Sequence, residues 1–332
     1  MEKQENTILI DWFSMTSKIH SPENFIQLLG LQDVVWEETK GVHGYQSRLY
    51  YDHISIHYNG REDMGIWLEM SGQGCRVFET HGHGDYDILF REWLDNEDEM
   101  NVTRIDIAFD DHEGLLDIHQ IVRDTQALDP DNNSLEFVSK FRKREVIWSH
   151  DDGGKPALTV QHGRKGSETM IRIYDKAAER GFSDRHWIRV ELQYRADRAA
   201  DFVRELLARK SDVGLLFRGV LYNYLRYVDD PYTDSNKWRW PLKDYWEKLL
   251  DGIGRIRLYK KPGKEYNMIN LENFVIGQAG NAIDTYIRIK GVDGLVNDLN
   301  SRENKNIKAE YRRLIRESLM EGESNSTAKS TK

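Results

Sequence analysis

The chain has 332 residues, of which 39% are hydrophobic and 31% charged, and its formal net charge is −9. This length and composition exclude a disordered or fibrous protein and allow one large domain or two ordinary ones. No apolar run approaches the ~20 residues of a membrane helix, and the N-terminus shows no signal peptide, so we expect a cytoplasmic protein without a membrane partner. The single cysteine, Cys75, excludes an internal disulfide and a multi-cysteine zinc site.

The charge is unevenly distributed along the chain. Residues 1–138 carry 9 Lys and Arg against 28 Asp and Glu, a net of −19. The net charge is +6 for residues 139–210 and +4 for residues 211–332. Because electrostatic fields are local, this asymmetry indicates polyanion binding by the later segments. Ordinary solvated faces would give the same counts, so charge alone leaves both interpretations open.

Strand patterns dominate the first 195 residues. Each segment is rich in β-branched or aromatic residues, and several alternate with period two. The predicted strands cover 7–15, 47–59, 65–72, 102–111, 157–163, 169–176 and 186–195. Amphipathic helix patterns between them cover 22–30, 86–96 and 115–127.

From about Ala196 the hydrophobic period becomes helical, over 196–210, 241–252, 271–291 and 307–320. The pattern predicts an α+β fold, with a twisted, mostly antiparallel central sheet, flanking helices and a helical C-terminal region. We expect one domain over 1–210, a helical region over 211–320 and a disordered, low-complexity tail over 321–332.

A faint internal repeat is visible. "ILIDWFS" and "TRIDIAFDD" each place an Ile-Asp pair in a strand, at Asp11 and Asp106, and residues 57–72 resemble residues 161–176. Two copies of one unit sharing a sheet would explain this pattern. Short strands also imitate one another by chance, so duplication is one of two interpretations.

Period-two alternation gathers polar side chains on one face of three strands. The strand 102–111 contributes Asp106, 169–176 contributes Arg172, Tyr174 and Lys176, and 186–195 contributes Arg189 and Glu191. An antiparallel sheet with one wetted face gives the same alternation.

Single carboxylates in strands as apolar as "ILIDWF", which holds Asp11, favour a functional face instead. A buried carboxylate is costly unless it is paired or bound to a metal, and converging carboxylates suit Mg²⁺ or Mn²⁺. Tyrosine is a weak nucleophile until a base or cations activate it. We expect Lys176 and Arg172 to lower the pKa of Tyr174 or to bind a phosphate.

Five ordered motifs then complete a resemblance. "LIDWFSMT", "SGQGCRVFE", "TRIDIAFDD", "IRIYDKAAER" and "WIRVELQYR" closely resemble replication initiation factors of the Rep_trans type over roughly residues 7–250. These proteins of phages, plasmids and integrative elements start rolling-circle replication or act as conjugative relaxases. The resemblance implies that Tyr174 attacks one strand at an origin, leaving a 5′-phosphotyrosine and a 3′-OH that primes synthesis.

The resemblance also implies site residues and partners. Asp106 and Glu191, with Asp11 as a third candidate, would hold Mg²⁺ or Mn²⁺, while Arg172, Lys176 and Arg189 would stabilise charge in the transition state. The partner would be single-stranded or hairpin-extruded origin DNA, and a homodimer and a helicase partner stay open. Two alternatives remain: a relaxase of an integrative conjugative element with the same chemistry, and a non-catalytic origin-binding regulator.

Overall fold

The structure is a computed structural model that describes residues 5–126, 135–149, 157–209, 212–253, 275 and 280–301. The chain divides into two compact units, residues 1–261 and 262–332, and each is described by itself. None of the described helices is both long enough and apolar enough to cross a membrane.

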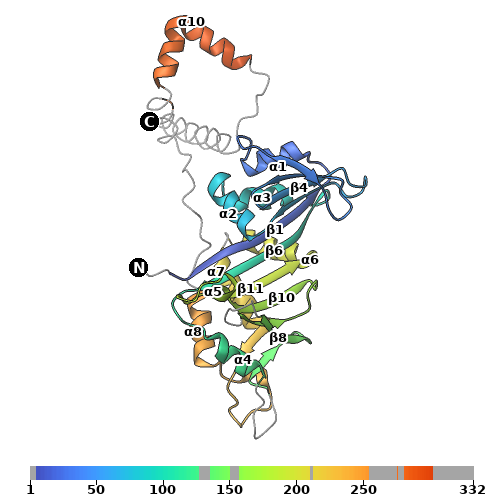
Figure 1. The fold of residues 1–332 in the computed structure, drawn as a ribbon, viewed down its shortest axis with the longest axis vertical. Coiled ribbons are helices and arrows are strands. Elements are labelled where there is room, and N and C mark those ends of the chain that lie inside the picture. The colour runs from blue at the N-terminus through green and yellow to red at the C-terminus, as the bar shows by residue number, and fades with distance from the viewer. Residues whose placement is uncertain are drawn as a thin grey trace, which may run out of the picture. The chain divides into compact units, whose positions relative to one another are not determined.

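A ten-stranded antiparallel sheet runs through the first unit, in the order β2-β3-β4-β5-β1-β6-β11-β10-β9-β8 (Figure 1). A two-stranded sheet pairs β7 (Phe137–Ser139) with β12 (Leu225–Tyr227). The large sheet confirms the predicted fold class. Its strands are β1 (Thr7–Ser17), β2 (Glu37–Lys40), β3 (Ser47–Tyr51), β4 (Ile54–Tyr58), β5 (Ile66–Met70), β6 (Met100–Asp111), β8 (Arg144–Ser149), β9 (Ala157–His162), β10 (Thr169–Asp175) and β11 (Ile188–Arg195).

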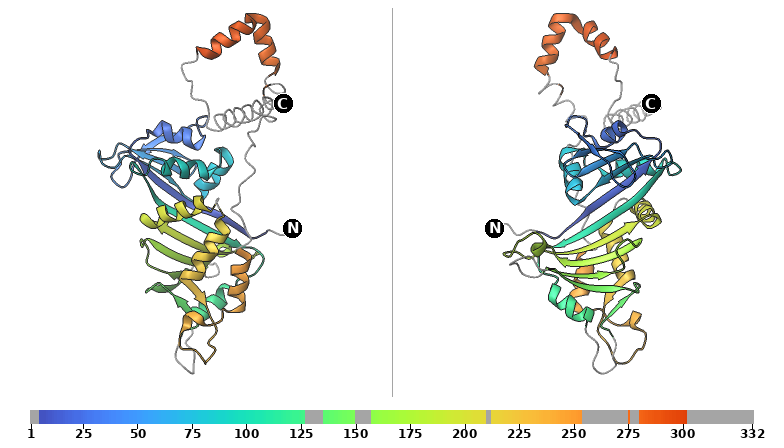
Figure 2. Two further views of the ribbon diagram at one scale, coloured as in Figure 1. Left: turned by 180° about the vertical axis from the view of Figure 1, so that it is seen from behind. Right: turned by 45° about the vertical axis from the view of Figure 1, so that its right-hand side comes forward.

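The helices of this unit cover one face of the large sheet (Figure 2). Ile105, Ile107 and Phe109 of β6 are fully buried against them, and helical side chains such as Phe78 and Phe217 complete the same core. Alternate strand residues therefore point to the opposite face, as the period-two pattern predicts. The helices are α1 (Pro22–Leu29), α2 (Gly72–His81), α3 (Tyr86–Leu94), α4 (Ile118–Gln126), α5 (Lys176–Glu179), α6 (Asp197–Ala208), α7 (Val213–Tyr224), η1 (Lys237–Arg239) and α8 (Asp244–Ile253).

Several predicted boundaries change. The predicted strand 47–59 is a hairpin of β3 and β4, because Asp52 and His53 turn the chain with positive φ. The motif "SGQGCRVFE" forms helix α2, which begins after Ser71 and is not among the predicted helices. Helices α7 and α8 bury apolar residues in the same core as the sheet, so residues 212–253 belong to the compact unit that the prediction ended at 210.

In the second unit the predicted helix 271–291 is described only in part. Helix α10 (Gly280–Asn300) continues beyond it, with a break at Gly291, where φ is 76°. The predicted helix 307–320 and the tail 321–332 lie outside the described residues.

Strand order is the same on both sides of the central β1–β6 pair. Reading outward, β1 is followed by β5, β4, β3 and β2, and β6 by β11, β10, β9 and β8. In this correspondence β4 is equivalent to β10 and β5 to β11. The segments 57–72 and 161–176, whose sequences resemble each other, are therefore not equivalent in the structure. Asp11 and Asp106 are not equivalent either. A β-bulge between Ile10 and Trp12 sets Asp11 out of register, and Trp12 pairs with Asp106.

One buried histidine in the core predicts an acid sensitivity. His162 of β9 is fully buried near Phe137, and neither ring nitrogen has a hydrogen-bond partner among the residues that the structure describes. Burial lowers the pKa of His162 to about 3. An unfolded histidine has a pKa of about 6.5, so the unfolded chain binds the proton more readily and stability falls as the pH drops below that value.

We expect His162→Leu to reduce this acid sensitivity. At pH 5 the unfolded chain binds a proton at this histidine while the folded ring stays neutral, which lowers the free energy of unfolding by about 2 kcal/mol relative to pH 8. The free energy of unfolding, measured with urea at both pH values, should therefore differ by about 2 kcal/mol less in the variant. An unchanged pH dependence would contradict the burial of this ring.

Candidate active site

The tyrosine of the "IRIYDK" motif lies on the face of the sheet that the helices leave uncovered. Tyr174 is 5% exposed, and its hydroxyl donates a hydrogen bond to Oε2 of Glu191 at 3.1 Å. Strand pairing explains the contact, because Glu191 lies opposite Arg172, two residues before Tyr174 on β10. Burial and the negative charge of Glu191 raise the pKa of Tyr174, while Arg189 opposes the shift. The phenol is therefore protonated at neutral pH and contacts a carboxylate.

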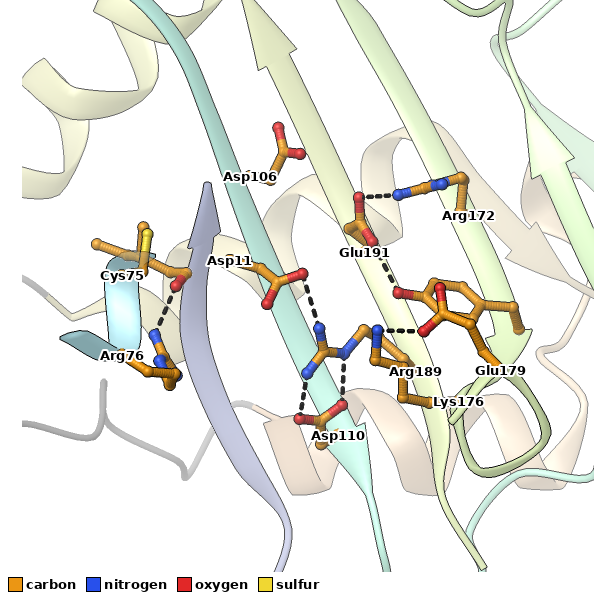
Figure 3. A network of polar contacts seen from close by, with 12 residues as sticks. Asp11, Cys75, Arg76, Asp106, Asp110, Arg172, Lys176, Glu179, Arg189 and Glu191 are labelled. Carbon is orange, nitrogen blue, oxygen red and sulfur yellow. Dashed lines mark hydrogen bonds and ion pairs between the residues drawn. The ribbon is translucent and has the colours of Figure 1, made fainter. Parts of the chain in front are cut away.

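Glu191 links this tyrosine to a cation. It is 2% exposed, and its second carboxylate oxygen forms an ion pair with Arg172 (Figure 3). One buried carboxylate thus accepts hydrogen bonds from a phenol and from a guanidinium. A carboxylate in this position can take the proton of the phenol.

Asp106 lies on the neighbouring strand β6. Its carboxylate accepts hydrogen bonds from Arg104 Nε at 2.9 Å and Gln193 Nε2 at 3.2 Å. Burial raises the pKa of Asp106 to about 6, with repulsion from Glu191 adding to it and the hydrogen bond from Arg104 opposing it. Two mutually repelling carboxylates therefore face the same space.

Arg189 binds two other carboxylates. Its Nε and Nη2 each lie 2.7 Å from an oxygen of Asp110, and its Nη1 lies 2.7 Å from Asp11 (Figure 3). Arg189 is 4% exposed and its guanidinium pairs with both carboxylates, so its predicted role in charge stabilisation stays a prediction. Asp11 is likewise held by Arg189, because the bulge turns its side chain toward β11.

Lys176 leaves the strand face on which the alternation put it. Strand β10 ends at Asp175, whose side chain caps α5 by accepting a hydrogen bond from Ala178 N at 2.8 Å. Lys176 then lies with Nζ 5.4 Å from the centre of the Tyr174 ring and forms an ion pair with Glu179. The guanidinium of Arg172 lies 5.5 Å from the same ring centre. Both cations lie near the ring. The pKa of Tyr174 is nevertheless raised, whereas the sequence predicted that these cations would lower it.

A cavity of about 310 Å³ joins these groups. Arg189 is not part of its lining. Trp12, Arg104 and the N-terminus of α2 also line the cavity and were not among the predicted site residues. The predicted site residues in the lining are Asp11, Asp106, Arg172, Tyr174, Lys176 and Glu191.

The expected three-carboxylate metal cluster is not assembled. Over the described ranges, no group of three or more His, Cys, Asp or Glu side chains is placed to hold a metal ion. Asp11 forms an ion pair with Arg189 instead. Asp106 and Glu191 remain as two oxygen donors at one cavity, each paired with an arginine.

The group of Arg189, Asp11 and Asp110 predicts a large stability effect. In Arg189→Met the buried Asp110 carboxylate, with 3% side-chain exposure, loses its partner, and we expect a loss of about 3–5 kcal/mol in the free energy of unfolding. Arg198→Met is the control, because the Arg198–Glu168 pair is exposed and worth less than about 1 kcal/mol. Urea denaturation of both variants tests this, and equal losses would contradict a buried ion group.

Comparison with known proteins decides the family. Residues 100–296 match the model of the family described as replication initiation factor, and residues 7–91 match the rolling circle replication initiation protein N-terminal domain. The chain belongs to the replication initiation factor family. Together the two matches cover most of the sheet and all the residues of the cavity.

Two similar proteins support this assignment to the family. A candidate DNA relaxase, NicK, of Bacillus subtilis (strain 168) is 30% identical over 277 residues, which are 78% of this chain and 74% of the relative. The solved structure of the rolling circle replication initiator protein from Geobacillus stearothermophilus is similar with a TM-score of 0.68 and 30% identity, covering 77% of this chain and 99% of that one. The expected function, rolling-circle replication initiation with relaxase-type nicking of origin DNA, is confirmed at the level of the family.

Proposed function

We propose that the initiator cuts one strand of its origin with Tyr174 as the nucleophile and Glu191 as the general base. The hydrogen bond from the Tyr174 hydroxyl to Glu191, at the cavity on the uncovered face, carries this proposal. A nucleophile in contact with its base, and a base oriented by a third group, are the usual parts of such a site. Arg172 is the group that orients Glu191 here.

The proposed reaction is a transesterification. Tyr174 Oη attacks the phosphorus of a phosphodiester, and its proton moves to Glu191. The bond from phosphorus to the 3′ oxygen breaks, and that oxygen takes a proton from water. The products are a 5′-phosphotyrosine and a free 3′-OH, which primes DNA synthesis.

Two cations at the cavity would stabilise the charge on the transferring phosphate. The side chain of Arg172 is 35% exposed, and Lys176 Nζ lies 5.4 Å from the centre of the Tyr174 ring. Such groups act strongly when they are held in place before the reaction. Arg189 would act as a positioning residue, since it fixes Asp110 and Asp11.

We also propose that the site takes a divalent cation, Mg²⁺ or Mn²⁺, between Asp106 and Glu191. Both are oxygen donors. Burial raises the pKa of Asp106 to about 6 and repulsion from Glu191 adds to the shift, and a cation held by both carboxylates would relieve that repulsion. Arg104 and Arg172 would then share these carboxylates with the ion. A bound ion would polarise the scissile phosphate.

Three further proposals concern the wider setting. All residues of the cavity lie within 1–210, which we propose as the nicking domain, with the helical region 211–320 in another role. We propose single-stranded or hairpin-extruded origin DNA as the substrate, and a second copy and a helicase as partners. We also propose that the initiator works in the cytoplasm.

The direct test is incubation of the full chain with supercoiled DNA that carries its own element's origin, with Mg²⁺ or with a chelator. We expect nicked circles with covalently attached protein when Mg²⁺ is present and none with the chelator. Binding without nicking under every cation tested would instead favour a non-catalytic origin-binding regulator.

A further inference from the structure

A second cavity lies beside the first on the same uncovered face of the sheet. It is larger, about 620 Å³, and shares Trp12 and Arg104 with the tyrosine cavity. The guanidinium of Arg104 lies 4.0 Å from the centre of the Trp12 ring while its edge bonds to Asp106, so this pair separates the two cavities. The complete lining is Trp12, Ser14, Thr16, His43, Tyr45, Trp67, Glu69, Thr103, Arg104 and Arg195.

Aromatic rings form one side of this second cavity. Trp67 stacks on the buried His57 with ring centres 4.5 Å apart and an interplanar angle of 20°. Tyr45 lies 6.1 Å from Trp67 at 30°, and His43 meets the same indole edge-on at 5.7 Å. Trp67 is only partly buried, so part of the indole is accessible from the cavity. A flat, partly exposed and rigidly supported aromatic ring is the platform on which proteins stack unpaired bases.

Polar groups of both kinds accompany the rings. Glu69 is partly buried, and within the described part of the chain it accepts no hydrogen bond, while its burial raises its pKa. Arg195, Ser14 and Thr16 supply donors in the same lining. A carboxylate beside donors matches the edge of a base that carries an amino group next to a ring acceptor.

The strand register makes this cavity the counterpart of the tyrosine cavity. In the central antiparallel pair, Ile10 pairs with Ile107 and Phe13 pairs with Ile105. A twofold rotation that exchanges β1 and β6 therefore maps Ile10 onto Ile105 and Phe13 onto Ile107. The same exchange maps Ser14 onto Ala108, and these two residues pair with Glu69 and Glu191. When the exchange is extended by one more strand, His57 of β4 takes the position equivalent to that of Tyr174 on β10. The second cavity therefore has a carboxylate, Glu69, at the position equivalent to Glu191. At the position equivalent to Tyr174 it has His57, whose ring stacks on Trp67.

We propose that the second cavity binds an unpaired base of the nicked strand, one with an exocyclic amino group such as cytosine, stacked on Trp67 and read by Glu69. This proposal rests on the proposed function, because the strand reaches the cavity from the phosphate held at Tyr174. From β10 to β5 is four strand spacings, about 20 Å. The base held here is therefore a few nucleotides from the cut.

Equilibrium binding of the full chain to three single-stranded 20-mers tests this proposal: oligo(dC), oligo(dT) and an abasic oligomer, at one fixed salt concentration and pH 8. We expect Trp67→Leu to weaken oligo(dC) binding by about 5- to 150-fold and to leave abasic binding unchanged. Glu69→Gln should abolish the preference of the wild type for oligo(dC) over oligo(dT). Tyr222→Leu, at a half-exposed tyrosine on α7, is the control and should change none of the three affinities.

Two outcomes would overturn the proposal. One is a Trp67→Leu variant that binds all three oligomers as the wild type does, or loses equally on all three, because stacking requires a base. The other is a Glu69→Gln variant that still prefers oligo(dC). Nicking of origin DNA is measured on the same preparations. Absent nicking by the wild type contradicts the proposed function, whereas intact nicking with either outcome above contradicts this inference alone.

Discussion

Tyr174→Phe is expected to abolish nicking and covalent attachment to DNA, with a rate loss of roughly 10⁴-fold or more, because the attacking oxygen is removed. The fold should persist. The phenyl ring keeps its place near Arg172 and Lys176, and within the described ranges the Tyr174 hydroxyl hydrogen-bonds to Glu191 alone. The change in the free energy of unfolding should stay within about 1–2 kcal/mol, and binding to origin DNA should remain.

Tyr194→Phe is the matched control for this prediction. Tyr194 is 4% exposed on the neighbouring strand β11, and its ring stacks on Phe202 in the helix-covered core. The control should nick and attach as the wild type does. A Tyr174→Phe protein that still transfers to labelled origin DNA would show that another residue is the nucleophile.

Glu191→Gln is expected to reduce nicking by about 10²- to 10⁴-fold while leaving DNA binding intact. The amide still accepts a hydrogen bond from Tyr174 or Arg172, but it cannot take a proton. Without the base, attack requires prior ionisation of a phenol whose pKa lies above its ordinary value. The residual rate of the variant should therefore rise about tenfold per pH unit between pH 7 and pH 9.

The pH profile separates a general base from a residue that only positions the tyrosine. The wild type should show a shallower rise than Glu191→Gln over the same range. Parallel profiles for the two proteins would contradict proton transfer to Glu191. Glu168→Gln, at an exposed carboxylate that pairs weakly with Arg198, is the control and should match the wild type.

The sequence predicted most of the sheet because the strands that form its centre alternate strongly. Strand β2, "EETK", is not predictable from the sequence, because it lies at the sheet edge with mostly exposed side chains and carries no apolar pattern. Helix α2 is not among the predicted helices, because Gly72 and Gly74 are poor helix formers. A Cβ at Gly74 would lie 2.2 Å from the backbone oxygen of His53, so this glycine serves close helix packing rather than a turn.

Which polar residues would share a face was predictable, but their partners were not. Alternation placed Tyr174, Glu191 and Arg189 together, yet the Asp11–Arg189–Asp110 group depends on a β-bulge and on cross-strand register. Neither is visible in one sequence. The second cavity shows the same limit. Trp67 and Glu69 alternate as expected on β5, but their neighbours come from other segments.

The central claim is that Tyr174 forms the covalent bond with DNA. Trypsin cleavage after Arg172 and Lys176 yields the peptide Ile173–Lys176, which holds one tyrosine. After reaction with origin DNA and nuclease digestion, mass spectrometry should find the nucleotide remnant on this peptide. A remnant on any other tyrosine-containing peptide, with Ile173–Lys176 unmodified, would contradict the account.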